Sequence, residues 1–144
     1  MRVLVQRSKN SKVSVDNKVV GEIDSGYVLF VGFTGTDTKE IVDKMVKKVL
    51  NLRVLDDSNG VMNESILDHN LSILSISQFT LYADSKKGNR PSYINALNGE
   101  EAVKLYDYFN EESKKYVHVE TGMFGAEMEV NIINDGPVTI LLEV

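Results

Sequence analysis

The segment Gly26-Tyr27-Val28-Leu29-Phe30-Val31-Gly32-Phe33 is apolar at successive positions rather than at alternate ones. Neighbouring side chains of a strand point to opposite faces of its sheet, so a strand with this pattern is covered on both faces. The segment therefore predicts a central strand, around which the rest of the fold is arranged.

The flanking sequence predicts further short strands and two helices. Apolar residues at helical spacing follow Asp37, with Glu40 three positions later, and a second helical stripe begins near Asn98. Alternating or short apolar runs predict strands at 1–7, 12–15, 19–23, 71–77, 116–120, 127–133 and 138–144. Together they indicate a single α+β domain over residues 1–144, in which curled, mainly antiparallel sheets form a barrel-like core with two helices packed on one side.

Composition excludes several classes of chemistry. The 144-residue chain has no cysteine, which rules out disulfides, thiolate metal sites and a cysteine nucleophile. His69 and His118 lack metal-ligand spacing, so neither a metal site nor a cofactor is expected. No apolar run reaches the length of a membrane span or a secretory signal, and we expect a cytoplasmic protein without a membrane partner.

The net charge of −5 argues against non-specific coating of nucleic acid, because that affinity depends on Lys and Arg. The net charge does not exclude a local contact with nucleic acid. The basic run Lys86-Lys87-Gly88-Asn89-Arg90 fits either a solvated loop or a contact with nucleic acid. A second basic group, at Lys44, Lys47, Lys48 and Arg53, fits a solvated helix face better.

Two segments stand out as candidate site elements. Ser77-Gln78-Phe79-Thr80-Leu81-Tyr82-Ala83 places polar side chains around a phenylalanine at the end of an apolar strand. It supplies hydrogen-bond donors for a developing oxyanion but no neighbouring general base, which favours a labile ester as substrate. Asn134-Asp135-Gly136-Pro137-Val138-Thr139 interrupts a strand where a backbone donor is expected. A capped strand end and a plain turn remain the alternatives.

Read together, these two segments resemble the signature motifs of the D-aminoacyl-tRNA deacylase, or D-Tyr-tRNA deacylase, family. Further segments resemble that family in the same order, so the resemblance covers essentially the whole chain. They are Gln6-Arg7, Lys87-Gly88-Asn89-Arg90-Pro91-Ser92 and Thr121-Gly122-Met123-Phe124-Gly125-Ala126-Glu127-Met128. One departure is Leu97-Asn98-Gly99, where a proline would be expected before the second helix.

The resemblance implies a homodimeric hydrolase with active sites at the subunit interface, which cleaves the ester joining a D-amino acid to the 3′-terminal adenosine of tRNA. It implies catalytic roles for Thr80, Ser77, Gln78 and Phe79, and adenosine binding by Phe124, Gly125, Ala126 and Met128. It also implies that Gly136 and Pro137 form a cis-proline selector, which Arg7 helps to hold, against L-amino acids.

Alternatives to this activity remain at this stage. A related editing enzyme would remove a small L-amino acid from tRNA with the Gly-Pro loop turned away. A non-catalytic module would instead dock RNA ends by stacking on Phe79, Tyr82 and Phe124. A hydrolase of free D-amino-acid esters or peptides would work without RNA.

Overall fold

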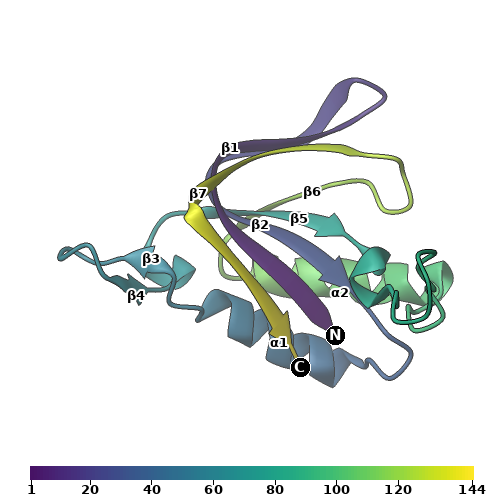
Figure 1. The fold of residues 1–144 in the computed structure, drawn as a ribbon. Coiled ribbons are helices and arrows are strands. Elements are labelled where there is room, and N and C mark those ends of the chain that lie inside the picture. Colours follow the sequence, from purple (N-terminus) through teal and green to yellow (C-terminus); the bar gives the residue numbers. More distant parts are fainter.

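The computed structural model describes residues 1–144 and is built on one five-stranded mixed sheet with two helices on one side (Figure 1). The strand order is β6-β5-β2-β1-β7. The strands of this sheet are β1 (Arg2–Val15), β2 (Lys18–Gly32), β5 (Ser72–Ser77), β6 (His118–Thr121) and β7 (Glu129–Glu143). The remaining elements are α1 (Lys39–Leu50), β3 (Leu55–Asp56), β4 (Met62–Glu64), η1 (Ile66–Asp68), η2 (Phe79–Tyr82) and α2 (Gly99–Lys114).

The predicted central strand is confirmed as part of β2, which lies between β1 and β5. Tyr27, Leu29 and Val31 point into the larger apolar cluster, which includes residues of both helices. Val28 belongs to a second, smaller cluster with Leu74. Successive side chains of β2 are therefore buried on opposite faces, as the continuous apolar run predicts.

Several predicted short strands are continuous in the structure. The strands expected at 1–7 and 12–15 form β1, and the Asp16-Asn17 turn, with φ of 48° and 61°, leads into β2. Gly26 lies within β2 at φ +140°, and a Cβ there would come within 1.8 Å of the Ser72 carbonyl oxygen. Only glycine permits this close approach of β5, so Gly26, the first residue of the predicted central segment, is required by the packing of β5 against β2.

The predicted barrel-like core of mainly antiparallel sheets is not found. β6 and β7 are the two edges of an open sheet, and β5 pairs in parallel with both β2 and β6. β1 is antiparallel to β2 and β7, so the sheet is mixed. The chain passes from β2 through α1 before it reaches β5, and such a crossover allows the parallel pairing that a hairpin cannot give.

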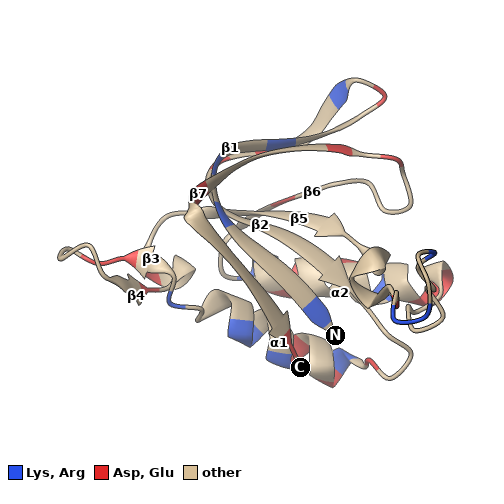
Figure 2. Ribbon diagram, in the orientation of Figure 1, with Lys and Arg blue, Asp and Glu red and all other residues tan.

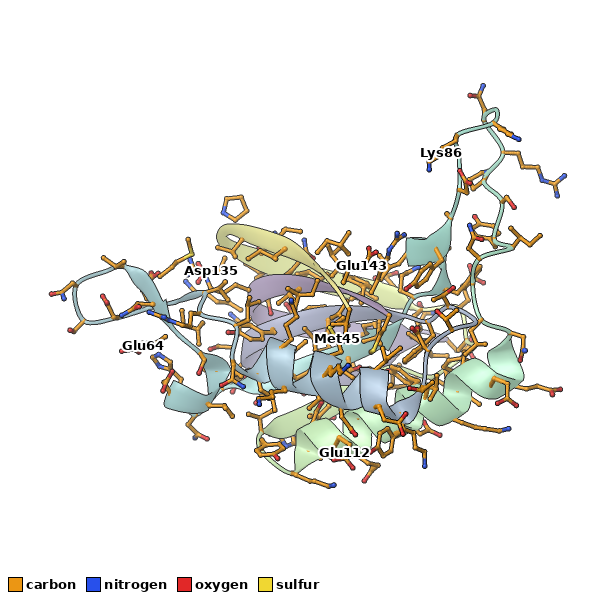
Figure 3. All side chains as sticks on the ribbon, turned by 90° about the horizontal axis from the view of Figure 1, so that it is seen from below. Met45, Glu64, Lys86, Glu112, Asp135 and Glu143 are labelled. Atoms are coloured by element: carbon orange, nitrogen blue, oxygen red, sulfur yellow. The ribbon has the colours of Figure 1, made fainter.

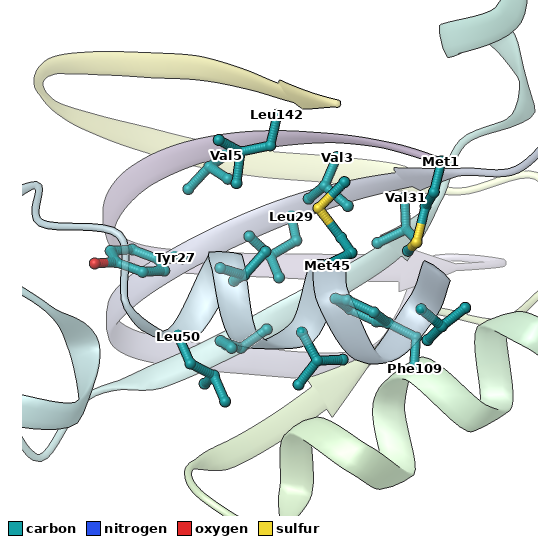
Figure 4. Packing of buried hydrophobic residues seen from close by; sticks show 14 of the residues in the cluster. Met1, Val3, Val5, Tyr27, Leu29, Val31, Met45, Leu50, Phe109 and Leu142 are labelled. Atoms are coloured by element: carbon teal, nitrogen blue, oxygen red, sulfur yellow. The ribbon is translucent and has the colours of Figure 1, made fainter. Parts of the chain in front are cut away.

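Both predicted helices are confirmed and cover one face of the sheet (Figures 1 and 4). Asn98 caps α2, since its side-chain oxygen accepts the backbone N–H of Glu101 at 3.1 Å. Phe109 of α2 and Met45 of α1 are fully buried against the sheet. No helix has the length and apolar character needed to cross a membrane.

Candidate active site

The Ser77–Ala83 segment lies where β5 leaves the sheet. Ser77 is the last residue of β5, and the backbone N–H of Gln78 donates to the Val31 carbonyl oxygen at 2.7 Å. The chain then turns into the short helix η2, beginning at Phe79. The N–H groups of Phe79 and Thr80 have no acceptor along that helix, and no side chain caps it.

A cavity of about 400 Å³ opens beside this turn. Its walls come from β2 and the residue after it, from the β5–η2 junction, from the start of α2 and from the loop after β6. The lining residues are Val31, Gly32, Phe33, Ser77, Gln78, Phe79, Tyr93, Ala96, Leu97, Asn98, Gly99, Ala102, Phe124 and Gly125. No charged side chain lines the cavity, so it suits a neutral group such as a nucleoside or an ester.

A second cavity, of about 260 Å³, is lined by part of the same segment. Its lining residues are Ile76, Ser77, Gln78, Phe79, Gly125, Ala126, Met128 and Val130. Ser77, Gln78, Phe79 and Gly125 thus contribute to both cavities. This second cavity also lacks charged side chains.

Thr80 is held by Gln78 and lines neither cavity. The Gln78 side-chain amide donates a hydrogen bond to the Thr80 hydroxyl oxygen. A nucleophilic hydroxyl needs a partner that accepts its proton, whereas this partner supplies one. The arrangement leaves the Thr80 hydroxyl hydrogen free to donate.

Neither histidine is placed to act as a base at this segment. His118 pairs with Ser72 at the amino end of β5, opposite the end that carries Ser77, and its ring nitrogen lies 2.7 Å from Glu120. The ring of His69 contacts Glu64 at 2.6 Å. No cluster of three or more His, Cys, Asp or Glu side chains offers a metal site.

Tyr93 forms a part of the cavity wall that sequence reasoning missed. Its ring packs edge-on against Phe79, with the ring centres 5.0 Å apart. The segment that carries it is fastened to the sheet, because Leu97 N–H donates to Phe33 O at 2.9 Å and the Thr34 hydroxyl donates to Asn95 O at 2.6 Å. Tyr93 directly follows the quoted motif Lys87–Ser92, which was the available signal.

The loop between β6 and β7 brings the other predicted residues to the site. Phe124 lines the larger cavity, Ala126 and Met128 line the smaller one, and Gly125 lines both. Gly125 has φ +76°, a conformation that favours glycine. The ring of Phe124 packs against Tyr106 of α2, with the ring centres 5.7 Å apart. The structure therefore brings this loop and the Ser77–Phe79 segment together.

The Gly136-Pro137 peptide bond is cis, and it lies far from these cavities within the same chain. Across the sheet, Ser77 of β5 pairs with Val31 of β2, which pairs with Val3 of β1, which pairs with Leu142 of β7. Gly136 and Pro137 of β7 lie beside Arg7 of β1, between the paired positions Gln6–Thr139 and Ser8–Asn134. About four residues along the strands and three strand spacings across the sheet separate them, or about 20 Å. Figure 3 shows Asp135 and Lys86, in the loop after η2, well apart on different sides of the molecule.

Arg7 holds the Gly-Pro segment to the rest of the fold. Its guanidinium donates to the Asp135 carbonyl oxygen at 3.2 Å, to the Val54 carbonyl oxygen at 2.9 Å and to the Asp56 carboxylate at 3.2 Å. Gly136 has φ +123°, and a Cβ there would lie 3.1 Å from an Arg7 nitrogen. The segment is thus fixed in position while Gly136 and Pro137 remain exposed.

Comparison with known proteins decides the family. The family model described as D-Tyr-tRNA(Tyr) deacylase matches residues 4–143. The chain belongs to this family. A D-aminoacyl-tRNA deacylase of Bacillus cytotoxicus is 52% identical over 144 residues, covering 99% of both chains. The D-aminoacyl-tRNA deacylase of Bacillus cereus strain B4264 is 51% identical with the same coverage. The resemblance found in the sequence motifs is thereby confirmed.

Two solved structures share the fold of this chain. A structure named c-Myc DNA Unwinding Element Binding Protein has a TM-score of 0.95 and 38% identity, covering 100% of this chain and 99% of that chain. A second, described as a probable eukaryotic D-amino acid tRNA deacylase, has a TM-score of 0.87 over 99% of this chain at 18% identity, and is a likeness of fold alone.

Proposed function

We propose that this member of the D-Tyr-tRNA(Tyr) deacylase family hydrolyses the ester between a D-amino acid and the 3′-terminal adenosine of tRNA. The observation that carries the assignment within the site is the Ser77–Phe79 wall, which contributes to two cavities without charged side chains. Such cavities suit a neutral nucleoside and an ester carbonyl. Because the proposed substrate is a tRNA, the proposal includes a location in the cytoplasm.

The terminal adenosine is seated against Phe124, Gly125, Ala126 and Met128. Phe124 lines the larger cavity, Ala126 and Met128 line the smaller one, and Gly125 lines both. Phe124 offers an aromatic face for base stacking, an interaction worth about 1–3 kcal/mol per base. This seat directs the aminoacyl ester toward the Ser77–Phe79 wall. Phe79 and Tyr93, whose rings pack edge to face, form an apolar part of the wall of the larger cavity.

The protein accelerates hydrolysis by stabilising negative charge on the ester carbonyl oxygen. Water adds to the carbonyl carbon, the bond to the ribose 3′ oxygen breaks, and a free amino acid and tRNA with a 3′-hydroxyl are released. The donors are the backbone N–H groups of Phe79, which lines both cavities, and of Thr80, which follows it, together with the Thr80 hydroxyl, whose hydrogen the contact with Gln78 leaves free. Each such donor is worth about 3–4 kcal/mol in the transition state. The 2′-hydroxyl of the adenosine assists proton transfer, since the cavities contain no carboxylate, histidine or lysine.

Chiral selection rests on the backbone carbonyls of Gly136 and Pro137. Main-chain oxygens placed against the substrate α-carbon exclude an L side chain without reading the identity of a D side chain. A ~10⁴-fold preference requires a clash worth about 5–6 kcal/mol. Reading side chains would yield only ~1–3 kcal/mol per methylene-sized difference.

The selector acts in a second copy of the chain. Gly136 and Pro137 are exposed and about 20 Å from the Ser77–Phe79 wall of their own chain, by strand register. A homodimer that places this segment at the partner's cavity satisfies both facts. Two-fold symmetry then produces two equivalent sites at one interface.

Hydrolysis of D-Tyr-tRNA and L-Tyr-tRNA under identical conditions tests the proposed function. Free D-tyrosine should appear with turnover, while L-Tyr-tRNA and L-Ala-tRNA persist at enzyme concentrations that clear the D-substrate. Preferential cleavage of L-Ala-tRNA would instead favour the editing alternative. Binding of tRNA without turnover would indicate a non-catalytic module.

Subunit mixing tests whether the selector acts in trans. A Gly136→Ala variant should cleave L-Tyr-tRNA, because a Cβ at Gly136 would come within 2.9 Å of Val138 and displace the loop. Adding an excess of the Gln78→Ala variant, which lacks the side chain that holds Thr80 but keeps the selector, should suppress this L-activity through heterodimers that supply an intact selector. Unchanged L-activity after verified subunit exchange would contradict a selector acting in trans.

A further inference from the structure

The loop between η2 and α2 carries a concentration of positive charge outside the cavities. Lys86, Lys87 and Arg90 are all exposed, and none forms an ion pair with a carboxylate. The whole chain has a net charge of −5, so without these three charges it would carry −8. We call residues 86–90 the basic loop; it is part of the projecting segment with Lys and Arg in blue near α2 in Figure 2.

The basic loop is anchored at the rim of the candidate site. Asp84 and Ser92 exchange two backbone hydrogen bonds of 2.8 Å, which close the base of the loop. On one side Asp84 follows η2, which begins at Phe79, and on the other Ser92 precedes Tyr93, whose ring packs against Phe79. The loop that carries the positive charges is therefore connected along the chain, at both of its ends, to residues that line the larger cavity, Phe79 and Tyr93.

A polar cleft of about 310 Å³ lies at the base of this loop. It is lined by Arg2, Thr34, Tyr82, Ala83, Asp84, Lys86 and Asn95. The cleft and the larger cavity adjoin along the chain, because Thr34 follows Phe33 and Asn95 precedes Ala96. Charged side chains, Arg2 and Lys86 together with Asp84, thus line the cleft beside the uncharged cavity.

We propose that the basic loop binds backbone phosphates of the single-stranded RNA that precedes the terminal nucleotide of the substrate. This inference rests on the proposed function, because the proposed function identifies the RNA as the acceptor end of tRNA. A terminal nucleoside inside an uncharged cavity leaves its phosphates outside, at the rim, where Lys and Arg side chains neutralise them. The unpaired charges of the loop are free for this contact.

The test compares two triple variants that remove the same charge. One is Lys86→Gln, Lys87→Gln, Arg90→Gln. The control is Lys44→Gln, Lys47→Gln, Lys48→Gln on α1, whose lysines are also exposed and line neither cavity of the candidate site. Each is assayed on D-Tyr-tRNA at several salt concentrations and on 3′-O-D-tyrosyl-adenosine, which has no phosphate.

For the loop variant, we expect the KM for D-Tyr-tRNA at low salt to rise about tenfold or more, while kcat is preserved. The slope of log KM against log salt concentration should become shallower by about 2, the value for three phosphate contacts on a single strand. Its activity on tyrosyl-adenosine should equal that of the wild type. An equal loss in the control variant, a loss on tyrosyl-adenosine or an unchanged salt slope would overturn the proposal.

Binding of uncharged tRNA, measured by fluorescence anisotropy with the same variants, separates this proposal from the proposed function. Weaker binding by the loop variant alone supports the phosphate contact even if no ester is cleaved. Equal binding by all three proteins overturns it even if D-Tyr-tRNA hydrolysis is established.

Discussion

The hydroxyl of Tyr106 in α2 donates a hydrogen bond to the backbone carbonyl oxygen of Ser75 in β5 at 2.7 Å. The same oxygen accepts the backbone N–H of Gly122 at 3.0 Å. The Ser75 carbonyl, two residues before Ser77, thus joins β5 to helix α2 and to the loop that carries Phe124. Burial raises the pKa of Tyr106, so its hydroxyl stays protonated as the donor.

We expect Tyr106→Phe to raise KM for D-Tyr-tRNA with little change in kcat. The loss of the hydroxyl frees the loop that seats the adenosine, whereas the oxyanion donors remain. Loss of this buried hydrogen bond should also lower the free energy of unfolding by about 1 kcal/mol, measured by urea denaturation. Tyr108→Phe is the matched control, because its hydroxyl contacts Asp43 of α1 instead. Equal kinetic effects of the two substitutions would contradict a positioning role.

Arg7→Lys should weaken discrimination between D- and L-substrates. Lysine retains the charge but cannot form the separate guanidinium hydrogen bonds to Asp135, Val54 and Asp56. We expect cleavage of L-Tyr-tRNA to rise while cleavage of D-Tyr-tRNA persists. Lys9→Gln serves as control, since exposed Lys9 contacts only the Asp135 carboxylate, at 3.1 Å. Unchanged L-Tyr-tRNA protection in Arg7→Lys would count against its role in holding the selector.

Thr80→Ala should reduce kcat by about 10²- to 10³-fold, the effect of losing one oxyanion donor. A substrate that ends in 2′-deoxyadenosine should also react slowly, because the 2′-hydroxyl assists proton transfer. Single-turnover rates on both substrates with both proteins check the assignment. Complete loss of turnover in Thr80→Ala together with normal hydrolysis of the deoxy substrate would establish a side-chain nucleophile instead.

Glycyl-tRNA should be hydrolysed together with D-aminoacyl-tRNA. Glycine has no side chain on its α-carbon, so exclusion by the carbonyls of Gly136 and Pro137 cannot reject it. The measurement is the release of glycine at enzyme concentrations that clear D-Tyr-tRNA. Strong protection of glycyl-tRNA under those conditions would argue for a site that recognises a D side chain directly.

Stability should fall as pH rises above 10, in part through Tyr27. Burial of this side chain, whose hydroxyl donates to the Leu52 carbonyl oxygen, raises its pKa to about 12. Between pH 10 and 12 the folded state binds more protons at Tyr27 than the unfolded state, so unfolding becomes more favourable as pH increases. Urea unfolding at pH 8 to 11 should show a shallower decline for Tyr27→Phe than for wild type. Parallel declines would exclude this contribution.

The part of the candidate site that is formed by consecutive residues could be predicted from the sequence. The polar cluster Ser77–Thr80 follows an apolar strand, and this contrast marks a strand end with free donors whatever the strand order. The walls that complete the cavity could not be found in this way. Tyr93 and Phe33 are far apart along the chain, and only packing brings both to the same cavity.

By itself, the sequence determined the local elements: the doubly buried strand around Leu29, the α2 start at Asn98 and the motif segments that identify the family. These depend on side-chain periodicity, capping and short-range geometry, which neighbouring residues set. Only the tertiary structure decided that the sheet is open and mixed, and that the Gly136–Pro137 segment lies at the end of the sheet away from Ser77. Strand order and register arise from burial of apolar faces between distant segments, which no local pattern specifies.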